Sequence, residues 1–182
     1  GEWTAVDQSS DIYDHQVRNL VNKLIEFVGR GELNRRLERY RRSLDLSGPI
    51  IREYYIRSRH PWWAAMSEYL ALERAGKSVK RHISDKIIAL AGDAKKISTL
   101  QRYMTPEIRE QYRTRLIDDN HAYACLFEIY IAWHFYLKRC QLEWHKDNST
   151  PHGEFLVSTP EFEFNVECKS ISVDIAPKVR RK

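Results

Sequence analysis

Two short alternating segments near the C-terminal end constrain the fold more than any other feature of the sequence. In Phe162–Lys169, "FEFNVECK", apolar and polar residues alternate at period two, which is typical of a β-strand with one buried face. Only Thr159-Pro160-Glu161 separates this segment from the apolar run Glu154–Ser158, a spacing short enough for a β-hairpin. Facing residues should then have numbers that sum to roughly 320 to 322, so Glu154 is predicted to lie opposite residues 166 to 168.

This register brings like charges together at one end of the hairpin. Glu154 and Glu167 would face each other with Cβ atoms about 5 Å apart, which is destabilising unless something neutralises them. A divalent cation is the natural candidate, because Mg²⁺ prefers one or two carboxylates together with waters and phosphate oxygens. Lys169, on the same face as Glu167, is placed to stabilise a developing negative charge or to hold an attacking water. The three side chains predict a site for metal-assisted phosphodiester hydrolysis.

The rest of the chain is predicted to be mainly helical up to about Ile117. Thr105-Pro106-Glu107 is the strongest helix start, with a cap, a proline and an acid in order. Apolar spacing and cap signals predict further helices over 11–29, 33–44, 50–56, 61–74, 79–90, 98–104 and 118–140, followed by strands over 141–145, 154–158 and 162–169. We therefore expect a helical N-terminal lobe, 1–117, and an α/β segment, 118–182.

The order of helix, strands and acids from 118 onward resembles the PD-(D/E)XK nucleases, the restriction-endonuclease-like superfamily. "GEFLV" at 153–157 is similar to the family's first acid and its apolar strand, and "VECK" at 166–169 is similar to its Glu-x-Lys. The resemblance implies an α/β (α+β) fold with a mixed sheet, Mg²⁺ or Mn²⁺ as cofactor, and Glu154, Glu167 and Lys169 as catalytic residues. It also implies that Glu128, on the preceding helix, joins the metal site, and we include Cys168 among the candidate ligands.

The family's core needs a helix and a strand after the Glu-x-Lys. Only "SISVDIAPKVRRK" follows here, and Pro177 breaks it. We therefore expect the core to be truncated at its C-terminal end or completed in an unusual way.

The charge of the chain favours a polyanionic partner. The net charge is +5 with a pI near 9.1. Arginines crowd one helical segment, and the guanidinium group suits bidentate phosphate contacts. We expect the nucleic acid to be DNA, and the candidates for binding it are Arg35, Arg36, Arg39 and Arg42. The alternative is a solvated helix face on which Glu32 and Glu38 pair with these arginines.

Other readings of the candidate residues stay open at this stage. Glu167 and Lys169 are also what a surface cross-strand ion pair would look like. His145, His152 and Asp147 are rivals near the site, and an aromatic set including Trp62 and Trp63 is either a base-stacking surface or helix core.

Composition limits the setting of the protein. Three cysteines without a C-x-x-C spacing indicate a reducing compartment, and no apolar run is long enough for a membrane span, so we expect a cytoplasmic protein with no membrane partner. Two functions remain: a metal-dependent nuclease whose helical lobe binds substrate, a protein partner or a second copy of the chain, or a catalytically inactive nucleic-acid-binding or assembly module that keeps the fold.

Overall fold

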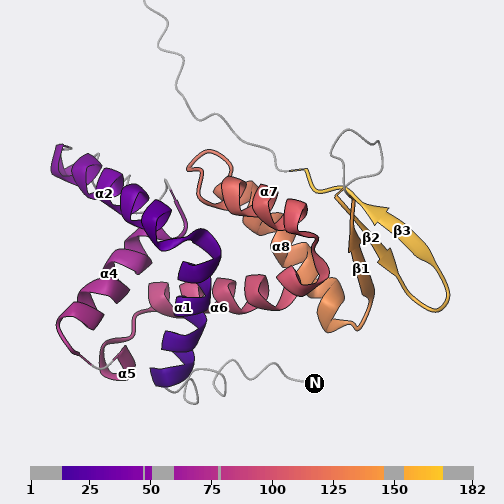
Figure 1. Ribbon diagram of the computed structural model, residues 1–182, viewed down its shortest axis with the longest axis horizontal. Helices are drawn as coiled ribbons and strands as arrows, with labels where there is room; N and C mark the ends of the chain where they lie inside the picture. The colour runs from indigo at the N-terminus through magenta and orange to yellow at the C-terminus, as the bar shows by residue number, and fades with distance from the viewer. Residues whose placement is uncertain (1–13, 47, 51–59, 78, 146–153, 170–182) are drawn as a thin grey trace, which may run out of the picture.

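The computed structural model describes residues 14–46, 48–50, 60–77, 79–145 and 154–169, and Figure 1 shows their arrangement. Most of the described chain is helical, and a small antiparallel sheet follows the last helix, which makes the class α+β. The elements are α1 (Asp14–Val28), α2 (Arg30–Leu46), α4 (Trp63–Arg74), α5 (Val79–His82), α6 (Asp85–Leu100), the 3₁₀ turn η1 (Gln101–Tyr103), α7 (Pro106–Leu116), α8 (Ala122–Leu137), β1 (Gln141–Trp144), β2 (Phe155–Ser158) and β3 (Glu163–Val166).

Most predicted helices are confirmed within a few residues at their ends. The start of α7 is as predicted, with Thr105 Oγ1 accepting a hydrogen bond from the Ile108 N–H at 3.3 Å and Pro106 in the first turn. The predicted helix over 50–56 lies almost entirely outside the described residues.

The prediction of separate helices over 79–90 and 98–104 is wrong. A single helix, α6, runs through the expected gap, and the true break falls just before it, where Ser84 caps the helix by accepting a hydrogen bond from the Ile87 N–H at 3.4 Å. The apolar stripe of α6 was hidden because a carboxylate, Asp93, is buried on it between Leu90 and Ile97.

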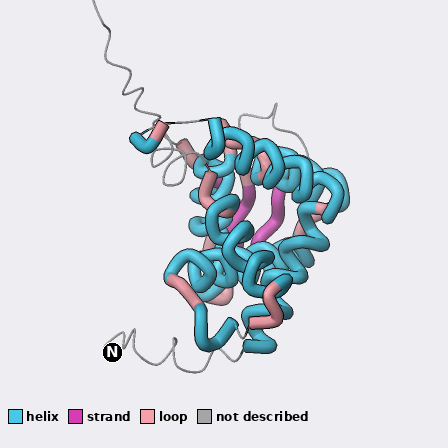
Figure 2. Tube along the Cα trace, turned by 90° about the vertical axis from the view of Figure 1, so that its left-hand side faces the viewer, coloured by secondary structure: helices cyan, strands magenta, loops and turns pink. Residues whose placement is uncertain are grey.

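Helix α6 lies at the centre of the helical body and packs against α1, α4 and α8 (Figures 1 and 2). Asp93 ties α6 to α8 and to the residue before α4, because its Oδ2 accepts from Trp62 Nε1 at 2.9 Å and its Oδ1 from the Tyr130 hydroxyl at 2.7 Å. Burial raises the pKa of Asp93, although both donors and the Lys96 ammonium oppose that rise. The two hydrogen bonds keep this buried carboxylate satisfied.

The three strands form a sheet in the order β1-β2-β3, antiparallel throughout. The predicted hairpin register is confirmed, since Phe155 pairs with Val166 and Ser158 with Glu163. The strands are shorter than predicted, and the described residues contain no parallel strand that would make the sheet mixed. Trp144, Phe155 and Val157 are buried and belong to the same core as the helices, so one face of the sheet is held against the helical body.

The boundary predicted between the two lobes falls at the end of α7. Ile117 is buried there, and buried side chains on both sides of it belong to one continuous cluster, from Val17 in α1 to Val157 in β2. The division at 117 stays a prediction. Within the described ranges, no helix is both long and apolar enough to cross a membrane.

His60 is a buried neutral histidine between α4 and α7. Its Nδ1 accepts from the Trp62 N–H at 3.0 Å, so the ring proton is on Nε2, which donates to the Leu116 carbonyl at 2.7 Å. The ring also stacks on Trp63 with centroids 3.8 Å apart. Burial lowers the pKa of His60 from 6.5 to about 4, because the charged imidazolium is poorly solvated there.

We predict that His60 makes the fold sensitive to acid. Between pH 6.5 and about 4 the unfolded chain binds a proton that the folded chain does not, so the free energy of unfolding falls as the pH falls, by up to about 3 kcal/mol. Urea unfolding across this range should show the difference in stability between wild type and His60→Gln narrowing towards low pH. A difference that stays constant with pH would contradict this account.

Candidate active site

Glu154 lies directly before β2, at the end of the sheet away from the hairpin turn. Its backbone is held on both sides, because the Glu154 N–H donates to the Val166 carbonyl at 2.8 Å and the Glu154 carbonyl accepts from the His145 N–H at 3.1 Å. The side chain adds a further hydrogen bond between these two segments, because Glu154 Oε2 accepts from the Cys168 N–H at 2.7 Å. The Glu154 carboxylate is therefore fixed against the backbone of the Glu-x-Lys segment.

Glu167 and Lys169 flank that hydrogen bond in sequence. Lys169 Nζ lies 3.4 Å from Glu167 Oε1, and the side chains are 78% and 58% exposed respectively. An ion pair this exposed contributes little to stability. Both groups are accessible to a ligand from solvent, and both lie within one residue of the amide that holds Glu154.

Glu128 is buried beneath this end of the sheet, and its charge is already compensated. Its Oε2 accepts from the Tyr112 hydroxyl at 3.0 Å and from Arg115 Nη1 at 2.9 Å, while Arg115 Nη2 reaches Oε1. The hydrogen bonds to Glu128 raise the pKa of Arg115. The pKa of the Tyr112 hydroxyl is raised mainly by burial and, to a smaller extent, by the charge of Glu128. Trp144 Nε1 donates to the same Tyr112 hydroxyl at 3.0 Å. In this arrangement Glu128 anchors α7, α8 and β1 to one another.

Cys168 reports on the electrostatics of the site. The pKa of its thiol is raised to about 12, chiefly by burial and then by the carboxylates of Glu154 and Glu128, while Arg115 opposes the rise. Both glutamates therefore act on the same point of the chain. The thiol is protonated at neutral pH, which disfavours Cys168 as a ligand, since metals bind the thiolate and Mg²⁺ prefers oxygen.

The donor set suits a hard cation held by few protein ligands. In the part of the chain that the structure describes, no three His, Cys, Asp or Glu side chains gather into a metal-binding group. Mg²⁺ needs no such group, because one or two carboxylates, waters and substrate phosphate oxygens are enough. Glu154 and Glu167 are the residues that fit this role.

The rival candidates have separate positions. His145 bonds across the sheet, its Nε2 lying 2.8 Å from Asn165 Oδ1, while Asp147 and His152 fall outside the described residues. Trp62 and Trp63 are buried, so they are helix core and not a base-stacking surface.

The arginine-rich segment forms an exposed face of α2, and part of its charge is paired. Glu32 bonds to Arg35 and to Arg36, the latter at 2.8 Å, and its pKa is lowered by these two arginines. Glu38 accepts a hydrogen bond from Arg42 at 3.0 Å, as expected for the alternative of a solvated helix face. No acidic partner of Arg39 is found among the described residues. Six arginines against three acids still leave α2 with a net charge of +3.

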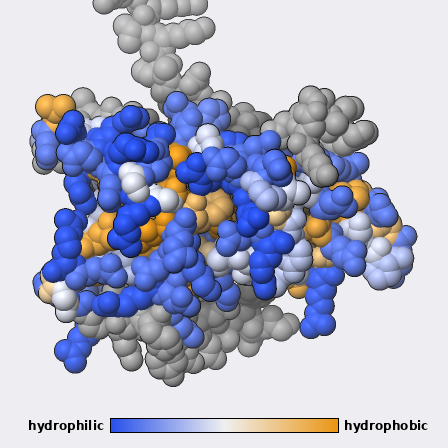
Figure 3. Space-filling model, viewed as in Figure 1, coloured by the Kyte–Doolittle hydropathy of each residue, from blue (hydrophilic) through white to orange (hydrophobic). Residues whose placement is uncertain are grey.

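Helix α2 lies far from the candidate acids. Figure 1 places it at the end of the long axis opposite the sheet, and Figure 3 shows mainly hydrophilic side chains over it. A ligand that touched both α2 and the end of the hairpin would have to extend along most of the molecule.

Sequence reasoning missed Arg115 and Tyr112. Both are on α7, and their spacing of three residues places them on one side of that helix. Nothing local pairs them with Glu128, which follows Arg115 by 13 positions on a different helix. The one available signal was a glutamate beside the apolar stripe of the predicted helix over 118–140, because a buried acid needs a partner.

Comparisons with known proteins add no family to this geometry. The chain matches no protein-family model, and no match was found among curated proteins or solved structures. Function is therefore inferred from the residues of the site.

Proposed function

We propose that the chain is a metal-dependent nuclease that hydrolyses phosphodiester bonds, in DNA, with a site similar to that of the PD-(D/E)XK enzymes. The observation that carries the proposal is the hydrogen bond from the Cys168 N–H to the Glu154 carboxylate, between Glu167 and Lys169 in sequence. It brings an acid from one strand to a Glu-x-Lys on its neighbour, which is the arrangement that the register of the hairpin predicts.

Each residue has a separate task in this proposal. Glu154, already oriented by a backbone N–H, and Glu167, exposed to solvent, hold the cation. Mg²⁺ or Mn²⁺, when bound, acts as a Lewis acid and lowers the pKa of a coordinated water. The Lys169 ammonium, beside Glu167, holds the attacking water or stabilises charge that develops on the phosphate oxygens. Glu128 orients the sheet and is not needed as a ligand.

The alternative is a catalytically inactive module that binds nucleic acid or assembles with a partner through its helical part. It is favoured by the fact that the carboxylates of Glu154 and Glu128 both have protein donors already, so neither depends on a cation to be satisfied. The two functions differ in whether Mg²⁺ is bound and used.

We predict that Glu167→Ala abolishes DNA cleavage and weakens Mg²⁺ binding, because a ligand is lost. Lys169→Ala should keep metal and DNA binding while the rate falls by about a hundredfold or more, since this cation acts mainly in the transition state. The matched control is Glu163→Ala, an exposed acid on the same strand that pairs with Ser158 at the other end of the hairpin.

The assay uses the protein in its full natural length with single-stranded, duplex and supercoiled DNA, Mg²⁺ or Mn²⁺, and chelator. Cleavage that survives in the Glu167 and Lys169 variants, or that needs no divalent metal, would contradict the mechanism. If the wild type binds DNA and does not cut it, the inactive module is the better account.

We also propose that α2 contributes to binding of the phosphate backbone. Replacing Arg35, Arg39 and Arg42 with glutamine should weaken duplex binding and lower the slope of log affinity against log salt by about 3, because each phosphate contact releases roughly one counterion. The control triple variant, Lys86→Gln, Lys95→Gln and Arg109→Gln, removes the same charge from exposed positions on α6 and α7. Equal losses in both variants would mean that only net charge matters.

A further inference from the structure

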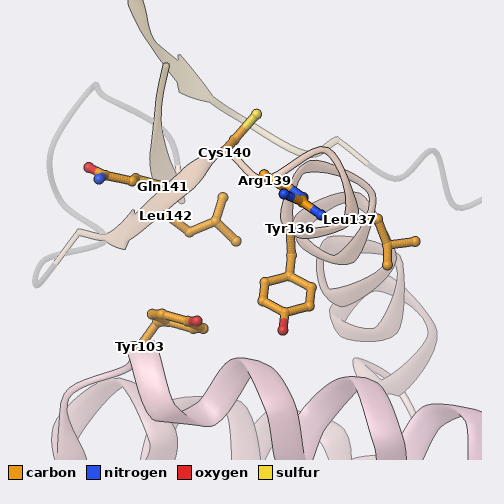
Figure 4. Close-up of a pocket in the computed structure, with 7 residues that line it drawn as sticks. All are labelled: Tyr103, Tyr136, Leu137, Arg139, Cys140, Gln141 and Leu142. Carbon is orange, nitrogen blue, oxygen red and sulfur yellow. The ribbon is translucent and has the colours of Figure 1, made fainter. Parts of the chain in front are cut away.

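A cavity of about 670 Å³ lies where η1, the end of α8 and the start of β1 meet (Figure 4). Its walls are Tyr103 from η1, Tyr136 and Leu137 from α8, and residues 139–142 of the following turn and strand. The volume is within the range of small-molecule sites, and no lining residue is acidic. The nuclease site makes no use of this cavity.

Two tyrosine rings form the aromatic walls. The ring centroids of Tyr103 and Tyr136 lie 6.1 Å apart, with an angle of 51° between the ring planes. Tyr103 is 49% exposed. Tyr136 is also packed against Trp133, whose ring stacks on it with centroids 5.2 Å apart and an interplanar angle of 28°. The Tyr136 ring is thus packed against the protein. Tyr103 is half exposed, and one face of its ring is turned toward the cavity (Figure 4).

Arg139 contributes a cation to the wall of the cavity, and its backbone conformation is unusual. Its φ is 61°, and it is the only non-glycine residue with positive φ in the described part of the chain. It ends α8 in a Schellman turn, where the Arg139 N–H donates to Tyr136 and the Cys140 N–H to Phe135. Glycine is the usual residue at this position, because a side chain is strained there. In Figure 4 the Arg139 side chain lies above Tyr136.

We propose that this cavity binds an unpaired nucleobase, which stacks on Tyr103 while its phosphate contacts Arg139. Aromatic faces with nearby cations bind bases in this way without needing sequence-specific hydrogen bonds. A base inside a duplex is stacked on its neighbours and cannot enter, so the cavity selects single-stranded or frayed substrate.

The cavity lies along the sheet from the candidate acids. Gln141, at the cavity, and His145, whose N–H bonds to Glu154, are four strand residues apart, or about 13 Å. A base held in the cavity would therefore position the strand with its scissile bond a few nucleotides away. This positioning role rests on the proposed nuclease function, but base binding itself does not.

The test is fluorescence anisotropy with a labelled oligothymidine strand and a fully paired duplex, in buffer with chelator so that cleavage does not interfere. Tyr103→Ala should weaken single-strand binding by about tenfold and leave duplex binding unchanged. Tyr103→Phe keeps the ring and should bind within about twofold of wild type. The matched control is Tyr123→Ala, which removes an equally exposed tyrosine, 49%, from α8 outside the cavity.

Arg139→Gly separates binding from folding. Glycine relieves the strain at φ 61°, so the melting temperature should stay the same or rise while single-strand affinity falls. The proposal is overturned if Tyr103→Ala binds the single strand like wild type, if Tyr123→Ala or Tyr103→Phe loses as much, or if duplex affinity falls equally. If the wild type does not cleave DNA but binds single strands through Tyr103, only the proposed nuclease function is overturned. If the wild type cleaves DNA and Tyr103→Ala has no effect on single-strand binding, only the proposed base-binding cavity is overturned.

Discussion

The arrangement of the sheet depends on the hydrogen bonds that the buried carboxylate of Glu128 accepts from Tyr112 and Arg115. These hydrogen bonds join α7 to α8, and the Tyr112 hydroxyl also accepts a hydrogen bond from Trp144 of β1. A sheet of three four-residue strands is marginal by itself and needs to pack on a helix. The network supplies directional contacts at that junction, and a buried charge that lost its partner there would be costly.

The candidate site depends indirectly on this contact between α7, α8 and β1. Trp144 positions the end of β1, the neighbouring His145 N–H bonds to the Glu154 carbonyl, and the Glu154 side chain in turn holds the Cys168 amide. The buried Glu128 is thus linked through Tyr112, Trp144 and the end of β1 to the part-buried Glu154 and the segment that carries Glu167 and Lys169. The candidate site lies at the end of the sheet away from the hairpin turn, where Glu167 and Lys169 are exposed to solvent.

The sequence predicted the hairpin well and the helical body less well. Turn length and period-two alternation are local signals, so the register that brings Glu154 to the Glu-x-Lys segment was predictable. The span of α6 was not, because the buried Asp93 interrupts its apolar stripe and is satisfied by partners on α8 and before α4. The role of Glu128 was not predictable either: a glutamate beside an apolar stripe looks the same whether its partner is a cation in solution or Arg115.

The most direct test of this account compares Arg115→Gln with Glu128→Gln in urea unfolding, with Mg²⁺ and with chelator. If Glu128 is a structural anchor, Arg115→Gln should lower the free energy of unfolding by about 3 kcal/mol, because it leaves a buried charge unpaired. Glu128→Gln should lower it by less, and Mg²⁺ binding should survive in that variant. Glu110→Gln, in the exposed pair with Arg113 on the same helix, is the control and should change little. If Glu128→Gln leaves stability intact and abolishes Mg²⁺ binding, then Glu128 is a metal ligand and the account is wrong.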